Sequence, residues 1–246
     1  MFILLPPSEG KADAPRRGAA VDLAKLSVPE LAEARRAVMD DLVKLAADPP
    51  AAIAVLGLGA GQTAEVERNA RLETAPAQAA GKVYTGVLYD ALDLAGLDAK
   101  ARARAGRELL IFSGLWGVVG LKDRIPPYRC SIGVNLAGVG TLAAHWKRAL
   151  KGPLDALVGD ALVLDLRSSA YAGMWAPRNA VGIRVLHGGK VVSHFNKATK
   201  GRIVRALLTS GARPRTAGKL TETLRGFGYR VEEPRSGQVD IHVEQL

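Results

Sequence analysis

The sequence predicts a mixed α/β fold, with residues 1–246 forming one compact domain in which a mixed β-sheet is surrounded by helices. Short apolar segments of strand length alternate with longer segments of helical period along the chain. Hydrophobic residues make up 48% of the 246 residues, so a substantial core can be buried. No repeat, low-complexity tract or clear linker divides the sequence, which favours one domain over two.

The N-terminal part of the chain is expected to form a strand followed by helices. Phe2–Leu5 is apolar and of strand length, and the loop that follows it is rich in Pro, Gly and charge. Glu30–Ala46 has apolar residues three or four positions apart, as in an amphipathic helix, and Pro49-Pro50 is expected to end it. Two further helices are predicted at about Gln62–Leu72 and Val87–Leu94.

The C-terminal part is expected to supply most of the sheet. Glu108–Phe112 and Ala161–Leu166 are apolar runs typical of buried strands. Helices are predicted over 141–157 and Ala198–Leu208. Alternating segments on either side of glycine-containing turns predict two hairpins, which are Val181–Leu186 with Lys190–Phe195 and Tyr229–Val231 with Val239–Val243.

Basic charge is concentrated toward the C-terminus. The net charge is +10, but residues 1–95 carry 10 Lys and Arg against 13 Asp and Glu, whereas residues 96–246 carry 24 against 11. Within residues 196–225 there are eight basic side chains and one acidic one. Clustered positive charge attracts polyanions such as nucleic acid, phosphorylated metabolites or anionic lipid, although a solvated basic face has the same composition.

The composition disfavours several classes of protein. No apolar run approaches the roughly 20 residues of a membrane span, and the start of the chain lacks the basic and long apolar regions of a signal peptide. The four histidines are scattered and Cys130 is the one cysteine, so neither a zinc site nor an internal disulfide is expected. We therefore expect a cytoplasmic protein that needs no cofactor and has no membrane partner.

Residues 55–64 carry the sharpest local pattern, in which a short apolar stretch, the turn glycines Gly57 and Gly59 and a new helix follow one another. This pattern is typical of a helix-hairpin-helix that binds DNA without reading its sequence. Glycine lets the backbone approach a phosphate closely, and N–H groups at the start of the second helix bind it. The alternative is an ordinary glycine-rich turn between helices, which the acidic Glu65 and Glu67 favour.

Three predicted strands are followed by loops rich in small and polar residues. Lys11 follows the first strand, Ser113 follows the second, and Arg167, Ser168 and Tyr171 follow the third. If these strands are parallel, the loops share one edge of the sheet, where open α/β sheets bind ligands. Hydroxyl groups, basic side chains and free loop N–H groups suit a phosphate, although turns alone need similar residues.

Two further places join basic side chains to features that suit a phosphate. In Pro127-Tyr128-Arg129 the aromatic ring can hold the guanidinium flat, although a surface Arg beside a core Tyr is an equally ordinary arrangement. Lys197, Lys200 and Arg202 lie near the expected start of a helix, with Asn196 as its N-cap. Cations are unfavourable at that end of a helix unless an anion is bound there.

Five of these segments together resemble the YaaA peroxide-stress family over nearly the whole chain. They stand in the family's order and spacing, and are Gly81–Gly86, Ser113–Gly117, Pro127–Arg129, Leu166–Tyr171 and Ser193–Gly201. The resemblance implies a compact α/β fold with a positively charged cleft and a helix-hairpin-helix element. It also implies DNA binding and a role in the response to hydrogen peroxide, through limiting iron-driven DNA damage.

The leading functional hypothesis is therefore a protein that binds DNA without strong sequence specificity and protects it under peroxide stress. The residues expected to contact phosphate are Lys11, Gly57, Gly59, Tyr84, Ser113, Tyr128, Arg129, Ser168, Tyr171, Lys197, Lys200 and Arg202. The alternative is an enzyme that acts on a nucleotide or nucleic-acid phosphate in the strand-end pocket, although no acid–base pair or partnered nucleophile stands out. A direct iron store is disfavoured because paired Glu-x-x-His motifs are absent.

Overall fold

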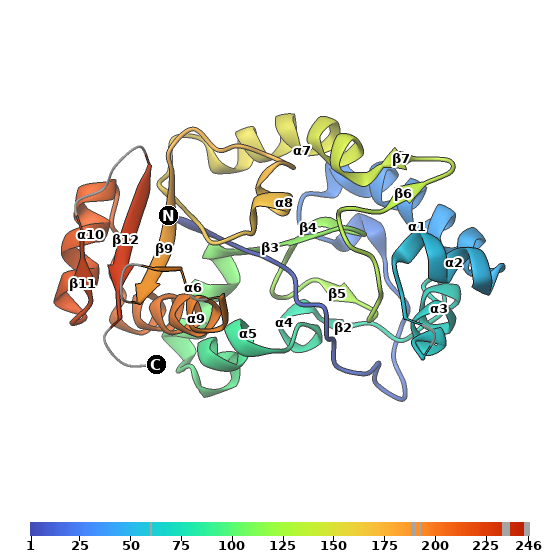
Figure 1. Ribbon diagram of the computed structural model, residues 1–246, viewed down its shortest axis with the longest axis horizontal. Helices are drawn as coiled ribbons and strands as arrows, with labels where there is room; N and C mark the ends of the chain where they lie inside the picture. The colour runs from blue at the N-terminus through green and yellow to red at the C-terminus, as the bar shows by residue number, and fades with distance from the viewer. Residues whose placement is uncertain (60, 188–189, 192, 233–236, 244–246) are drawn as a thin grey trace.

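The computed structural model describes residues 1–59, 61–187, 190–191, 193–232 and 237–243. Its main sheet contains β1 (Phe2–Leu5), β3 (Leu109–Ser113), β4 (Gly117–Gly120), β8 (Val163–Asp165), β9 (Ala180–His187), β10 (Lys190–Val191), β11 (Arg230–Val231) and β12 (Gln238–His242). The strands are ordered β11-β12-β9-β8-β1-β3-β4, with β10 beside β9 (Figure 1). The five central strands are parallel, whereas β4, β10 and β11 pair antiparallel at the margins. The sheet is therefore mixed, as the sequence predicts.

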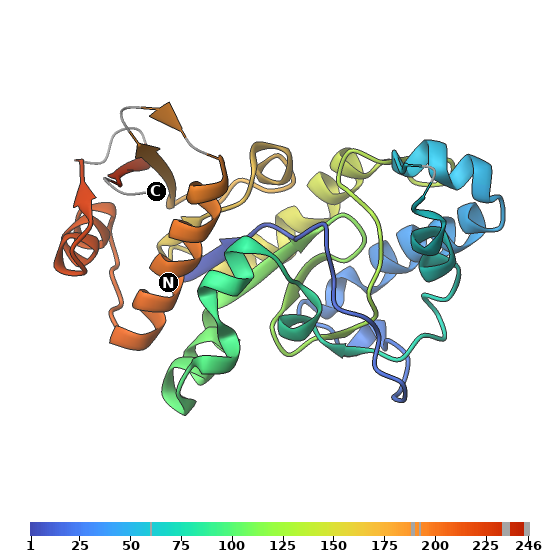
Figure 2. The same ribbon diagram turned by 60° about the horizontal axis from the view of Figure 1, so that its bottom comes forward.

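Helices surround this sheet and extend beyond it at both ends. They are α1 (Ala32–Ala46), α2 (Pro49–Leu56), α3 (Thr63–Ala70), α4 (Ala80–Val83), α5 (Val87–Leu92), α6 (Ala99–Glu108), α7 (Leu142–Val158), α8 (Ser169–Ala172), α9 (Ser193–Ser210) and α10 (Ala217–Gly226). Figures 1 and 2 show α7 on one side of the sheet and α5, α6 and α9 on the other, with α1–α3 at one end and α10 at the opposite end. Short strand pairs form outside the main sheet, between β2 (Gln78–Ala79) and β5 (Arg124–Ile125) and between β6 (Asn135–Leu136) and β7 (Gly140–Thr141).

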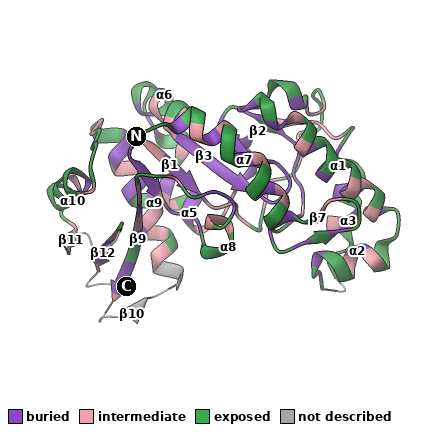
Figure 3. Cartoon of the chain, turned by 90° about the horizontal axis from the view of Figure 1, so that it is seen from above, coloured by how far each residue is buried: buried purple, intermediate pink, exposed green. Residues whose placement is uncertain are grey.

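The core lies between the sheet and its covering helices. Strand β3 is buried along its whole length, which is why its sequence reads as an unbroken apolar run rather than an alternating one. Helix α7 buries a stripe of residues four positions apart, which are Leu142, Trp146, Leu150, Leu154 and Val158. Figure 3 shows buried strands at the centre and exposed outer faces on the helices.

The structure confirms the predicted strands Phe2–Leu5, Glu108–Phe112 and Ala161–Leu166 to within a few residues. They correspond to β1, β3 and β8, and β1 pairs in parallel with both of the others. The loops after them therefore do emerge at one edge of the sheet. The predicted helices over 30–46, 62–72, 87–94 and 141–157 also form, as α1, α3, α5 and α7.

Two local predictions are wrong, and one helix start was missed. The helix before Pro49-Pro50 does end ahead of them, at Ala46, but the prolines also begin α2, because the first turn of a helix does not use their missing N–H. The predicted strand Lys190–Phe195 is a strand only at β10, and its last residues already belong to α9. Asn196 is therefore inside the first turn of α9 and is not the N-cap. The turn residues 188–189 lie outside the described part of the chain.

Candidate functional site

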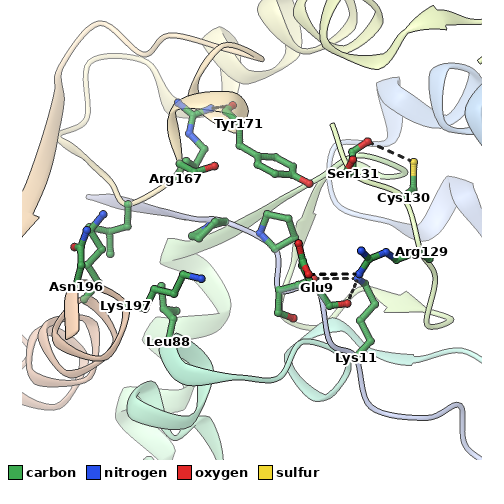
Figure 4. Close-up of a pocket in the computed structure, with 16 residues that line it drawn as sticks. Glu9, Lys11, Leu88, Arg129, Cys130, Ser131, Arg167, Tyr171, Asn196 and Lys197 are labelled. Atoms are coloured by element: carbon green, nitrogen blue, oxygen red, sulfur yellow. Dashed lines mark hydrogen bonds and ion pairs between the residues drawn. The ribbon is translucent and has the colours of Figure 1, made fainter. Parts of the chain in front are cut away.

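A pocket of about 410 Å³ lies at the carboxyl ends of β1 and β8 (Figure 4). Its lining comes from the loop after β1, the loop after β8, the segment Arg129–Ser131, the first turns of α9 and Leu88 of α5. The two strands are parallel neighbours, so their loops leave the sheet side by side. The hydroxyl of Tyr89 on α5 donates to the Pro6 carbonyl at 2.7 Å, which anchors the first of these loops.

Four of the predicted cationic residues line this pocket: Lys11, Arg129, Lys197 and Lys200. In Figure 4, Lys11 and Arg129 lie on one side of the pocket, and Lys197 lies on the opposite side with Asn196. The lining contains one carboxylate, Glu9, whose Oε2 is 3.7 Å from the nearest Arg129 nitrogen. Positive charge therefore exceeds negative charge on the pocket wall.

The Lys11 ammonium is held at the base of the loop after β1. Its Nζ donates to the carbonyls of Ser8 at 3.0 Å and Glu9 at 3.3 Å, and lies 4.3 Å from the centre of the Tyr128 ring. Burial, followed by the nearby Arg129 charge, lowers the pKa of Lys11 to about 8. The side chain is thus largely charged at pH 7, but it gives up its proton more readily than an exposed lysine.

The two lysines of α9 are differently placed. Lys197 is exposed, whereas Lys200 is partly buried, and burial lowers the pKa of Lys200 while the charge of Asp165 opposes that shift. Neither makes a hydrogen bond or ion pair within the described part of the chain. Their charges are therefore available to a ligand in the pocket.

Tyr84, Ser113 and Tyr128 are brought together, but behind the pocket wall rather than on it. The Tyr128 hydroxyl is 2.6 Å from Ser113 Oγ and 3.0 Å from the Tyr84 hydroxyl. Ser113 Oγ also accepts hydrogen bonds from the backbone N–H groups of Leu115 and Trp116. All three predicted residues are buried, so this network supports the wall and presents the Tyr128 ring to Lys11.

The loop after β8 is organised around Arg167. Its guanidinium makes two hydrogen bonds to the Asp165 carboxylate, at 2.9 and 2.6 Å, and lies 4.2 Å from the centre of the Phe112 ring. It also donates to the carbonyls of Tyr171 and Trp175. Its hydrogen-bonding capacity is used within the protein, so Arg167 shapes the pocket but has little left for a ligand.

Ser168 and Tyr171, which this loop carries, both line the pocket. Ser168 is exposed, and burial raises the pKa of the half-buried Tyr171 to about 12. Cys130 also lines the pocket, and burial raises the pKa of its thiol to about 12. Both groups are therefore protonated at neutral pH, when Tyr171 is a hydrogen-bonding group and Cys130 is a poor nucleophile.

Besides Tyr84, Ser113 and Tyr128, three more predicted site residues lie outside the pocket lining. Gly57 and Gly59 lie between α2 and α3, and Arg202 is exposed on α9 near Tyr229. One residue that sequence reasoning missed connects α3 to the pocket. The buried Asn69 side chain donates to the Arg129 carbonyl at 2.7 Å and accepts from the Arg129 N–H at 2.9 Å.

The fold and this site define an α/β domain with a cation-lined, ligand-sized pocket at the carboxyl edge of a largely parallel sheet. The sequence model of peroxide stress protein YaaA matches residues 1–235, and the chain belongs to this family. It is 56% identical over 240 residues to a UPF0246 protein of Streptomyces coelicolor, covering 94% of this chain and 92% of the relative. UPF0246 proteins of Corynebacterium efficiens and Corynebacterium glutamicum (strain R) are 42% and 40% identical, each aligned over 95% of its own length.

Within the described residues, none of the helices combines the length and the apolar character that crossing a bilayer requires. The same residues contain no group of three or more His, Cys, Asp or Glu placed to hold a metal ion.

Proposed function

We propose that this protein binds nucleic acid without strong sequence specificity, and that the strand-end pocket binds phosphate groups of the backbone. The observation that carries the proposal is the placement of Lys11, Arg129, Lys197 and Lys200 around one pocket with a single carboxylate. Membership of the peroxide-stress family supports a role under peroxide stress. Within that role, the proposed task is to protect DNA from iron-driven damage in the cytoplasm.

The electrostatics of the pocket favour an anionic ligand. Burial, and after it the charge of Arg129, lowers the pKa of Lys11, which means that its charged form is disfavoured there. A phosphate beside Lys11 and Arg129 offsets both effects and accepts hydrogen bonds from the two cations. Backbone phosphates are common to every sequence, so contacts of this kind carry no sequence preference.

The α2–α3 hairpin is a second element through which DNA contact is proposed. A Cβ built at Gly57 meets no atom within 4 Å, so this face of the turn is open to a ligand. The Gly59 N–H already donates to Gln62 Oε1 at 2.9 Å, so a phosphate at that position has to displace the glutamine. The hairpin is therefore the weaker of the two proposed contacts.

An enzyme acting on a phosphate-containing nucleotide is the second candidate. Two observations favour it: the lowered pKa of Lys11, and a pocket volume of about 410 Å³, which falls in the range of small-ligand sites. A lysine with a pKa near 8 can accept or donate a proton near neutral pH, as catalysis requires.

The experiment that tests the proposal is a salt series of binding measurements with duplex, single-stranded and branched DNA and with a small nucleotide. Affinity for DNA should fall steeply with salt, with a slope of about −0.9 per duplex phosphate contacted. Lys197→Ala and Lys200→Ala should each weaken binding alike across sequences and reduce the salt slope by about one unit. Lys151→Ala, which removes an exposed lysine of α7 outside the pocket, is the matched control.

Two outcomes would contradict the proposal. The first is a DNA affinity that is independent of salt or undetectable at low salt. The second is a pair of pocket variants that bind DNA like the Lys151→Ala control but no longer bind the small nucleotide. The second result would support the enzyme instead.

A further inference from the structure

We propose that the pocket receives a single nucleotide swung out of a nucleic-acid strand, with its flanking phosphates toward opposite sides of the pocket and its base against Asn196. The inference rests on the proposed function and adds what the pocket recognises. Three features of the pocket carry it: cations on two opposite sides, apolar side chains in the lining, and an unsatisfied buried acceptor.

The cations are divided between two sides rather than gathered at one point. Lys11 and Arg129 come from loops on one side, and Lys197 from α9 on the other (Figure 4). A single phosphate needs one cluster of cations, whereas a nucleotide within a strand carries a phosphate on each side of its sugar. The division of charge therefore matches a nucleoside that lies in the pocket with one phosphate toward each side.

Apolar side chains share the pocket lining with these cations. Pro6, Pro7, Leu88 and Leu166 contribute aliphatic faces, and Tyr171 contributes a ring. A flat base is stabilised by contact with such surfaces once it has left its stack. A pocket of about 410 Å³ holds one nucleotide, and a paired duplex can lie only across its mouth.

Asn196 supplies a polar group to read the base. It lines the pocket, and its Oδ1 is buried without a hydrogen-bond partner. A buried acceptor without a donor is unfavourable. Because Oδ1 is shielded from solvent, the Asn196 side chain has to turn toward a ligand that offers an N–H group, and that turn relieves the cost. The exocyclic amino groups of nucleobases are donors of this kind.

The first test uses small ligands and calorimetry. Adenosine 3′,5′-bisphosphate should bind at least about tenfold more tightly than adenosine 5′-monophosphate, because it engages both cationic sides. Asn196→Ala should weaken binding of adenosine bisphosphate by about tenfold and leave the bisphosphate of purine riboside, which lacks the amino group, unchanged. Asn135→Ala, on β6 outside the pocket, is the matched control and should change neither.

The second test uses DNA and reports base extrusion directly. A duplex with 2-aminopurine should become more fluorescent on binding, because this base is quenched while stacked. A duplex with one mispaired base should bind about tenfold more tightly than a fully paired one, since less pairing energy is lost. Unchanged fluorescence, together with equal affinity for paired and mispaired duplexes, overturns the inference. If DNA binding still depends on salt in that case, the proposed function stands. Absence of all DNA binding overturns both.

Discussion

Replacing Asp165 with Asn tests whether a buried ion pair holds the β8 loop at the pocket. The Arg167 side chain is 1% exposed, and its only carboxylate partner among the described residues is Asp165, with a shortest distance of 2.6 Å. The same guanidinium donates to the carbonyls of Tyr171 and Trp175, so it ties the whole loop to the end of β8. An amide at position 165 keeps the shape of the side chain but removes its charge.

The magnitude follows from how deeply the pair is buried. Removing one partner of a buried ion pair costs about 3–5 kcal/mol, because the other charge is left uncompensated. The Asp165 side chain is 16% exposed, and an amide oxygen still accepts one hydrogen bond from Arg167. We therefore expect the lower end of that range, a loss of about 3 kcal/mol in the free energy of unfolding. Urea denaturation followed by circular dichroism measures it.

The matched control is Asp240→Asn. Asp240 also pairs with a single arginine through two hydrogen bonds, but Arg184 is 48% exposed, so solvent screens the pair. Removing the Asp240 charge should cost no more than about 1 kcal/mol. If Asp165→Asn costs as little as Asp240→Asn, the Arg167 pair does not organise the loop, and the reasoning about the pocket wall is refuted.

Two further predictions concern the packing of α9 and the charge of Lys11. Gly201→Ala should lower the free energy of unfolding by about 1–3 kcal/mol, because a Cβ there collides with the Leu88 carbonyl. Gly218→Ala, on the open face of α10, should instead raise it by up to about 1 kcal/mol. Urea denaturation compares the two variants, and equal effects would contradict the collision. The pKa of Lys11 is lowered from 10.5 to about 8 in the folded chain, so between these pH values the unfolded chain binds the extra proton and stability should rise with pH relative to Lys11→Met. A stability difference that stays flat between pH 7.5 and 10 would show that the Lys11 pKa is not lowered.

The sequence predicted which strand ends share one edge of the sheet better than it predicted the elements around that edge. Apolar runs in β1, β3 and β8 are long enough to identify, and their parallel pairing brings the loops after β1 and β8 together at the pocket. Helix α6 was missed because its buried stripe consists of Ala101 and Ala105, which give little hydrophobic periodicity in an Arg-rich segment. Strand β4 was missed because Gly117 and Gly120 bound it and glycine predicts turns.

Within the site, the sequence identified the charged residues but not the residues that hold them in place. Lys11, Arg129, Lys197 and Lys200 were all expected near the strand ends, and all line the pocket. Asp165 and Asn69 were not expected, because their importance depends on long-range or buried contacts that spacing along the chain does not show. Ser113 was assigned to the surface of the site because polar side chains in strand-end loops are typical of ligand contacts. Tyr128 was assigned to it because its ring could hold the Arg129 guanidinium flat, and Tyr84 because it lies in a segment that resembles the YaaA family. The structure instead satisfies their hydroxyls with one another.

The α2–α3 hairpin shows why a glycine pattern alone does not identify a phosphate contact. Gly57 has a φ of 63° and ends α2, so glycine is favoured there by the backbone conformation before any ligand is considered. The helix that follows carries Asn69, which fixes the backbone of Arg129 through two hydrogen bonds. Because the hairpin positions one of the pocket cations in this way, a glycine substitution that disturbs α3 should weaken anion binding even when the turn itself never touches the ligand. Measuring anion affinity in an Asn69→Ala variant, whose turn is intact, separates this indirect effect from direct contact at Gly57.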